Sequence, residues 1–74
     1  MIDQLQEIVR LYTADESIVL KGEMVLLTDL GLNSYELVEM VCEVEAKFGV
    51  EIPDKAIREL KTVQELLDYI SAHE

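Results

Sequence analysis

The segment from Asn33 to Gly49 constrains the fold of this chain more than any other. Asn33 with Glu36 three residues later predicts a capping box, and Gly49 predicts a left-handed C-terminal cap. The segment therefore predicts a helix from about residue 34 to residue 48. The apolar residues between the caps recur at the spacing of one helical face: Leu37, Met40, Val41, Val44 and Phe48.

Three further helices are expected. The first covers roughly residues 2–13, a short third opens at Pro53-Asp54, and the fourth starts with a capping box from Thr62 to Glu65. The positions expected to face inward are Leu5, Ile8, Val9 and Tyr12 in the first helix, Ala56, Ile57 and Leu60 in the third, and Val63, Leu66, Leu67 and Ile70 in the fourth.

Residues 14–33 are too long a connection to lack structure in so small a domain. Their many aliphatic side chains predict a packed loop, with a helical turn near residues 16–20 or 24–28. A short strand pair around Lys21-Gly22 is an alternative, but a lone hairpin is marginal. The aliphatic residues concerned are Ile18, Val19, Leu20, Met24, Val25, Leu26, Leu27, Leu30 and Leu32.

These elements predict an all-α fold: a small four-helix bundle of three longer helices and one short one, with residues 1–74 as a single domain. Half of the 74 residues are apolar, which is too many for a disordered chain despite the net charge of −10. The predicted core contains Leu5, Ile8, Val9, Leu37, Met40, Val41, Val44, Phe48, Ile57, Val63, Leu66 and Ile70.

The acidic balance excludes some partners. Six basic residues are scattered among sixteen acidic ones, whereas nucleic acids and anionic membranes attract clustered Lys and Arg. A partner with a basic surface patch is the natural complement.

Cys42 is the single cysteine and His73 the single histidine, so neither an internal disulfide nor a usual zinc site is expected. No metal is therefore expected. The start of the chain does not look like a signal peptide, and no apolar stretch is long enough to span a membrane. We expect a soluble, cytoplasmic monomer.

Ser34 is the candidate site residue. A serine beside Asn33 at a helix start is by default part of the cap. The same position also suits covalent phosphate chemistry, because an exposed hydroxyl there lies beside free backbone N–H groups at the positive helix end. Position alone does not distinguish these two interpretations.

Four ordered motifs carry a resemblance: Asp29-Leu30-Gly31, Asn33-Ser34-Tyr35, Glu51-Ile52-Pro53-Asp54 and Thr62-Val63-Gln64. Over residues 26–71 the chain resembles the acyl carrier protein family. The resemblance implies that a phosphopantetheinyl transferase attaches 4′-phosphopantetheine from coenzyme A to Ser34. It also implies that the arm's thiol holds acyl or aminoacyl groups as thioesters, and that the chain has no catalytic residues of its own.

Two departures bear on the pathway. Asn33 stands where the family usually has Asp, and Tyr35 stands where it usually has Leu. A dedicated polyketide or lipopeptide pathway therefore competes with fatty acid biosynthesis. The alternative from another class is an acidic helical adaptor that is never modified.

A second surface lies on the outer side of the Asn33–Gly49 helix. Tyr35, Val38, Cys42 and Ala46 form an apolar stripe, with glutamates at 36, 39, 43 and 45 beside it. In one interpretation Val38 and Cys42 pack under the loop or the third helix, and the glutamates are only solvated.

The resemblance favours the other interpretation of this stripe. It implies that the partner contacts are Tyr35, Val38, Glu39, Cys42 and Glu45. We also expect the second and third helices to leave a cavity for a short or medium acyl chain.

Overall fold

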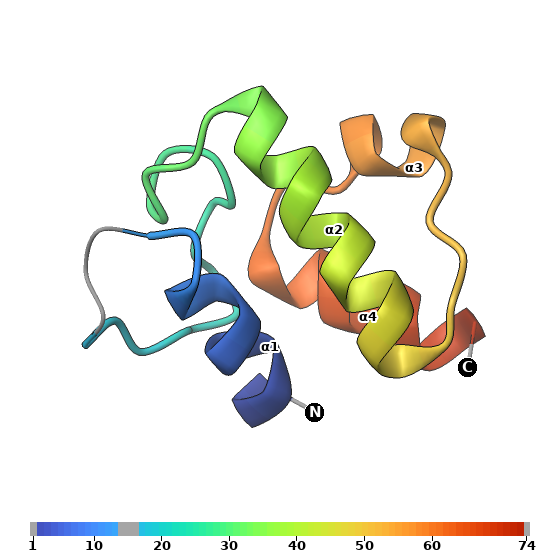
Figure 1. The fold of residues 1–74 in the computed structure, drawn as a ribbon, viewed down its shortest axis with the longest axis horizontal. Helices are drawn as coiled ribbons and strands as arrows, with labels where there is room; N and C mark the ends of the chain where they lie inside the picture. The colour runs from blue at the N-terminus through green and yellow to red at the C-terminus, as the bar shows by residue number, and fades with distance from the viewer. Residues whose placement is uncertain (1, 14–16, 74) are drawn as a thin grey trace.

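The computed structural model describes residues 2–13 and 17–73. It contains four helices: α1 (Ile2–Arg10), α2 (Ser34–Phe48), α3 (Asp54–Glu59) and α4 (Val63–His73). α2 crosses in front of α4, α1 packs against α2, and α3 lies beside the first half of α2 (Figure 1). The described residues contain no strand, so the all-α prediction is confirmed.

The ends of α2 are set by local sequence. The Asn33 side chain accepts a hydrogen bond from the Glu36 N–H at 2.7 Å, and the Glu36 carboxylate accepts one from the Asn33 N–H at 3.1 Å. At the other end, Gly49 has φ +68° and donates its N–H to the Glu45 carbonyl at 2.9 Å. Both predicted caps are confirmed.

α1 is shorter than predicted. It ends at Arg10, and the N–H groups of Leu11 and Tyr12 donate to the carbonyls of Ile8 and Val9, three residues back. These i to i−3 bonds form a tighter turn than the α-helix. The prediction that the helix continues to residue 13 is therefore wrong.

The loop after α1 is held by side chains of α1. The Arg10 guanidinium donates two hydrogen bonds, of 3.1 and 3.0 Å, to the Ile18 carbonyl. The Gln6 side chain accepts one from the Leu20 N–H at 2.9 Å. Residues 18–21 form no helical turn, while residues 14–16 lie outside the described part.

One helical turn occurs farther along this loop. The Asp29 N–H donates to the Val25 carbonyl at 2.9 Å, and the Asp29 carboxylate accepts from the Val25 N–H at 2.6 Å. The turn ends at Gly31, which has φ +68° and is followed by a bond from the Leu32 N–H to the Leu27 carbonyl. This confirms the expected turn near residues 24–28.

The same loop is joined to the start of α4. The Leu26 N–H donates to the Lys61 carbonyl at 2.8 Å, and the Val63 N–H donates to the Met24 carbonyl at 2.9 Å. Together they frame a single antiparallel bridge between Val25 and Thr62. Within the described residues no strand pair forms around Lys21-Gly22, and the Gly22 carbonyl instead accepts a hydrogen bond from the Gln64 N–H at 3.0 Å.

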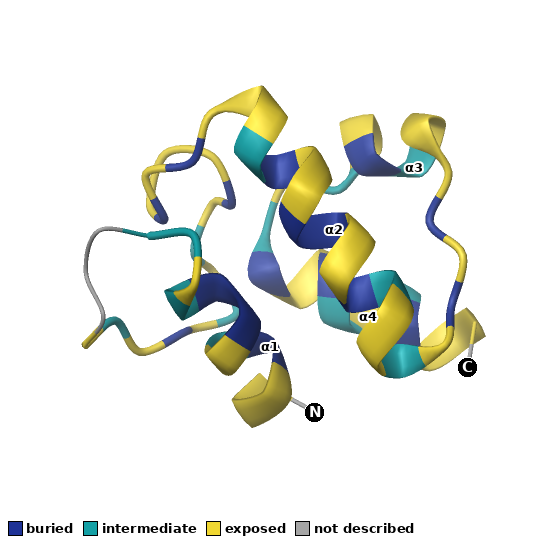
Figure 2. Cartoon of the chain, viewed as in Figure 1, coloured by how far each residue is buried: buried dark blue, intermediate teal, exposed yellow. Residues whose placement is uncertain are grey.

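All four helices and the loop share one core (Figure 2). Every predicted core residue is buried except Phe48, which is partly exposed because it lies at the last position of α2. The core also includes residues that the helical pattern did not identify. The buried residues are Leu5, Ile8, Val9, Leu20, Leu26, Leu30, Leu32, Leu37, Met40, Val41, Val44, Val50, Ile52, Ile57, Val63, Leu66 and Ile70.

Other apolar positions depart from expectation. The predicted inward-facing residues Tyr12, Ala56, Leu60 and Leu67 are only partly buried and pack at the edge of the core. In the loop, Val19, Val25 and Leu27 are exposed by 61, 37 and 39%. A loop held by its backbone cannot turn every side chain inward, so only part of its aliphatic residues reach the core.

The capping box of α4 leads to a pH prediction. The Glu65 carboxylate accepts hydrogen bonds from the N–H groups of Thr62 and Lys61, at 3.0 and 3.1 Å, and the Thr62 hydroxyl oxygen accepts from the Glu65 N–H. The backbone hydrogen bond from Thr62, followed by that from Lys61, lowers the pKa of Glu65 below its ordinary value of 4.5.

A lowered carboxyl pKa stabilises the fold above the unfolded-state pKa, and this contribution is lost as the pH falls through the folded-state pKa. Glu65→Gln should therefore be less stable than wild type at neutral pH, and the difference should shrink below about pH 4.5. Urea unfolding of both proteins between pH 3 and 7 would measure it. A difference that does not change with pH would contradict a role for the charge.

Candidate functional site

Ser34 is the first residue of α2, and its side chain is exposed. Asn33 supplies the cap, and the Ser34 hydroxyl forms no hydrogen bond with any other residue in the described part of the chain. The default role of a serine at this place, capping the helix, is therefore taken by its neighbour. The hydroxyl is free for chemistry.

The electrostatic surroundings of Ser34 favour an anion. The first N–H groups of a helix have no acceptor within it, and their dipoles give this end a partial positive charge. A phosphate group bonded to the Ser34 oxygen would lie at this end of α2.

The Asp29-Leu30-Gly31 motif forms the turn that leads to Ser34. Asp29 closes this turn through its carboxylate, Leu30 is 4% exposed and anchors it in the core, and Gly31 supplies the positive φ. Each residue type has a local structural task. The motif fixes the approach of the chain to Ser34.

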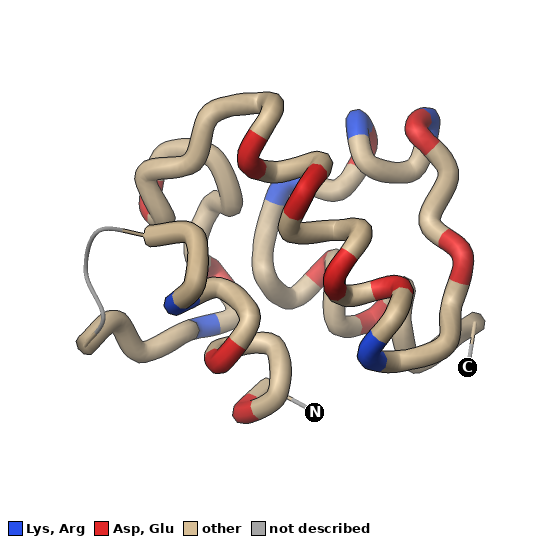
Figure 3. Tube along the Cα trace, in the orientation of Figure 1, with Lys and Arg blue, Asp and Glu red and all other residues tan. Residues whose placement is uncertain are grey.

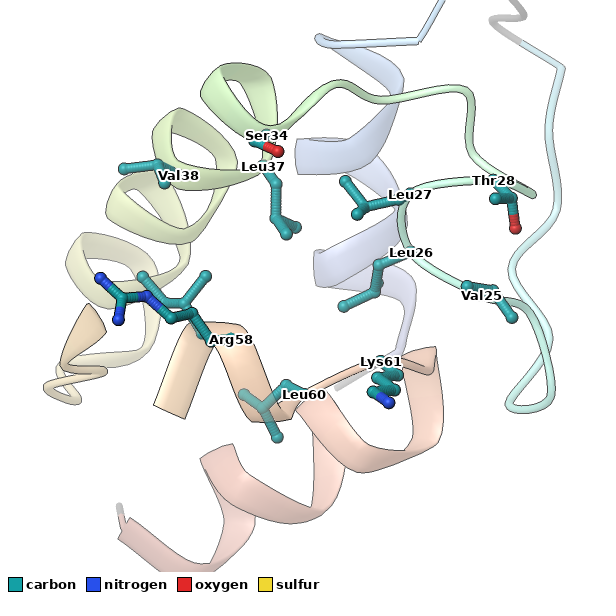
Figure 4. Close-up of a pocket in the computed structure, with 11 residues that line it drawn as sticks. Val25, Leu26, Leu27, Thr28, Ser34, Leu37, Val38, Arg58, Leu60 and Lys61 are labelled. Atoms are coloured by element: carbon teal, nitrogen blue, oxygen red, sulfur yellow. The ribbon is translucent and has the colours of Figure 1, made fainter. Parts of the chain in front are cut away.

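A cavity of about 550 Å³ opens beside Ser34 (Figure 4). Its walls come from the start of α2, the turn at residues 25–28, and α3 with the residues after it. This volume lies within the range of about 300–1,000 Å³ that is usual for small-molecule sites. The lining residues are Val25, Leu26, Leu27, Thr28, Ser34, Leu37, Val38, Ile57, Arg58, Leu60 and Lys61.

Sequence reasoning expected a cavity between the second and third helices, and one is present. It did not identify the wall formed by Leu26 and Leu27, which lie in the loop. The loop's aliphatic content indicated packing, but no local pattern placed these two side chains opposite α3. Figure 4 shows both pointing into the space below Ser34.

The outer stripe of α2 is largely exposed. Tyr35 is 72% and Val38 42% exposed, and Cys42 and Ala46 are exposed as well. Cys42 therefore does not pack under the loop or under α3, and Val38 lies at the rim of the cavity. Figure 3 shows acidic positions along α2, and both basic and acidic positions on α3.

The four glutamates of α2 have different surroundings. Glu39 and Glu43 are exposed, whereas Glu36 and Glu45 are half-buried. Glu36 belongs to the capping box, and the Glu45 carboxylate accepts a hydrogen bond from the Ile52 N–H at 3.0 Å. Glu45 therefore also holds the α2–α3 connection in place.

Tyr12, which the sequence pattern placed on the inward face of the first helix, borders this acidic surface. Its hydroxyl lies 3.5 Å from the Glu39 carbonyl oxygen. Desolvation raises the pKa of Tyr12, and the nearby charges of Glu43, Glu39 and Cys42 add to this rise. The turn after α1 thus lies against the middle of α2, a contact that no local pattern could indicate.

A family model for the phosphopantetheine attachment site matches residues 3–70. The chain belongs to this family. The match confirms the resemblance to acyl carrier proteins, and the cofactor of the family is covalently attached 4′-phosphopantetheine. Carrier domains of this kind interact with phosphopantetheinyl transferases and with biosynthetic enzymes, and they are typically not catalytic themselves.

The residues around Ser34 fit this prosthetic group. The hydroxyl is exposed and free, the helix end suits the phosphate, and the adjoining cavity has room for part of the arm or its cargo. In residues 2–13 and 17–73, no group of three or more side chains is placed to hold a metal ion. None of the helices there is long and apolar enough to cross a membrane.

Proposed function

We propose that Ser34 is the attachment point of 4′-phosphopantetheine and that the chain carries acyl or aminoacyl groups as thioesters on this arm. One observation supports the assignment to Ser34 above all others. An exposed hydroxyl, with no hydrogen-bond partner among residues 2–13 and 17–73, lies at the positive end of α2 and at the edge of an apolar cavity. We also propose that residues 1–74 form one carrier domain, because the four helices share a single core.

The chemistry of the carrier is divided between the arm and the protein. When bound, the arm supplies a thiol, which ionises more readily than an alcohol and is a better leaving group in acyl transfer. Ser34 supplies the oxygen that anchors the arm, and the cavity walls can cover an acyl chain and keep water from it.

His73 is not placed to act as a general base for Ser34. This residue, the single histidine of the chain, lies in the last turn of α4, stacked on Tyr69 with ring centroids 4.0 Å apart. Its Nδ1 atom is 2.8 Å from the Tyr69 carbonyl oxygen. We therefore propose that the transferase deprotonates Ser34 and that the carrier itself is not an enzyme.

Co-expression with several broad-specificity phosphopantetheinyl transferases, followed by intact-mass measurement, tests this function. Wild type should gain the mass of one arm. If it stays unmodified with every transferase, the unmodified acidic adaptor becomes the better assignment. If wild type is modified, identifying the enzyme that loads the thiol would distinguish fatty acid from polyketide or related pathways.

We further propose that partner enzymes contact Tyr35, Val38, Glu39, Cys42 and Glu45. Tyr35, Val38, Glu39 and Cys42 are exposed along one side of α2, next to the attachment residue. An apolar strip with an acidic border suits a partner groove that is apolar at its centre and basic at its rim. Such charges mainly raise the rate of association.

Charge reversal on this face should slow modification without unfolding the domain. The double variant Glu39→Lys/Glu43→Lys should lower kcat/KM for the transferase by about tenfold or more at low salt. Its unfolding free energy should change by only about 0.5 kcal/mol, because both side chains are exposed. Glu45 is left intact because its carboxylate holds the Ile52 N–H.

Asp68→Lys/Glu59→Lys is the matched control, since it makes the same change of charge on α4 and α3. The control should be modified at nearly the wild-type rate. Equal slowing in both double variants would mean that only net charge matters, and the α2 docking face would be rejected.

A further inference from the structure

The cavity beside Ser34 differs in charge from the rest of the molecule. The chain has sixteen acidic and six basic residues, yet the cavity lining contains no acidic residue and includes two of the basic ones, Arg58 and Lys61. The other lining residues are aliphatic, apart from Thr28 and Ser34. The site next to the proposed attachment point is therefore apolar and locally positive.

The two basic residues border the cavity from different sides. Figure 4 shows the Arg58 side chain extending from α3 toward the Val38 side of α2, and Lys61 on the side of Leu26. Leu26, Leu27 and other aliphatic side chains also line the cavity. A group entering from the Ser34 side would cross apolar surface before it reached a cation.

The Arg58 side chain is available to a ligand. Neither an ion pair nor a hydrogen bond engages its guanidinium among the described residues. Asp54, four residues earlier on α3, lines a smaller hollow of about 220 Å³ together with Arg58 and competes for the guanidinium. Lys61 faces one competing carboxylate, that of Glu65, whose pKa it helps to lower.

We propose that this cavity selects cargo with an anionic end, namely acyl groups that carry a carboxylate at the far end from the thioester. This inference rests on the proposed carrier function. The apolar walls would cover the methylene groups, and either Arg58 or Lys61 would bind the carboxylate, depending on the length of the acyl chain. The Arg58 guanidinium could form two parallel hydrogen bonds with it. A plain alkyl end would instead bring apolar surface against a hydrated cation and gain nothing from it.

The phosphate of the arm is the other anion that could reach these residues. It is present in every loaded form, whatever the cargo. A comparison of two cargoes that differ only at the far end therefore removes its contribution.

A broad-specificity transferase is used to attach acyl-phosphopantetheine to the protein from coenzyme A thioesters. One thioester carries hexanoic acid, and the others carry the dicarboxylic acids with four, six and eight carbons. In the dicarboxylic cargoes the terminal carboxyl is labelled with ¹³C. Intact mass first establishes that loading has occurred. The pKa of the labelled carboxyl is then measured by NMR and compared with that of the same acyl group on free pantetheine.

At least one of the dicarboxylic cargoes should show a carboxyl pKa about one unit lower on the protein than on free pantetheine, because nearby cations favour the charged form. Arg58→Gln/Lys61→Gln should abolish this shift. Lys47→Gln/Lys55→Gln, which removes two charges outside the cavity lining, should retain most of it. Amide shifts at Leu27 and Leu37 should differ between the hexanoyl and the matching six-carbon dicarboxylic forms.

Two results would overturn the proposal: no lowered pKa with any chain length, or an equal effect of both double variants. Both results are measured on protein that carries the arm, so neither would contradict the carrier function. If the carrier function itself were wrong, the protein would gain no mass with any of the thioesters.

Discussion

Ser34→Ala should abolish attachment of 4′-phosphopantetheine completely while leaving the domain folded. The loss should be total because no second hydroxyl is expected to replace the anchoring oxygen. The fold should be preserved because Asn33, not Ser34, caps α2, and the Ser34 hydroxyl has no partner to lose within the described part of the chain. Intact mass and far-UV circular dichroism measure the two effects separately.

The expected change in unfolding free energy is within about 0.5 kcal/mol, as for other exposed substitutions. Alanine is also a better helix former than serine, so a small gain is as compatible as a small loss. Ser71→Ala on α4 is the control and should be modified like wild type. If the Ser34→Ala protein is still modified, or if the Ser71→Ala protein is not modified, Ser34 is rejected as the anchor.

Leu26→Ala should destabilise the domain by about 2–5 kcal/mol, the cost of removing a fully buried leucine side chain. Leu26 is 2% exposed although it lies in a loop between two helices. Since domains are stable by only about 0.05–0.15 kcal/mol per residue, this would take much of the total. Urea unfolding followed by circular dichroism would measure it.

Leu27→Ala is the matched control. Leu27 is the next residue, lines the same cavity and loses the same atoms, but it is 39% exposed. Leu27→Ala should lower the free energy of unfolding by only about 1 kcal/mol, because much of the Leu27 side chain is already in water. Similar losses in both variants would mean that the loop does not hold Leu26 in the core as described.

Both predictions depend on the loop before α2. The turn closed by Asp29 and Gly31 directs the chain to Ser34, and Leu26 anchors the same turn to the core. The segment thus positions the attachment residue and forms one wall of the cavity. A destabilised loop should therefore disturb the site as well as the stability of the fold.

The sequence by itself determined the elements whose ends are set by near neighbours. α2 begins and ends where Asn33, Glu36 and Gly49 predict, because these caps bond within four residues along the chain. The start of α4 follows from Thr62 and Glu65 for the same reason. Ser34 was identified from its place among ordered motifs.

Only the tertiary structure decided the rest. The Leu26 N–H finds its acceptor at Lys61, and Glu45 finds its donor at Ile52, so neither partner is visible in a local pattern. The end of α1, the burial of Val50 and the cavity wall opposite Arg58 depend likewise on contacts between distant segments. Local hydrogen bonds and periodicity fix where helices form, whereas long-range contacts fix which side chains meet.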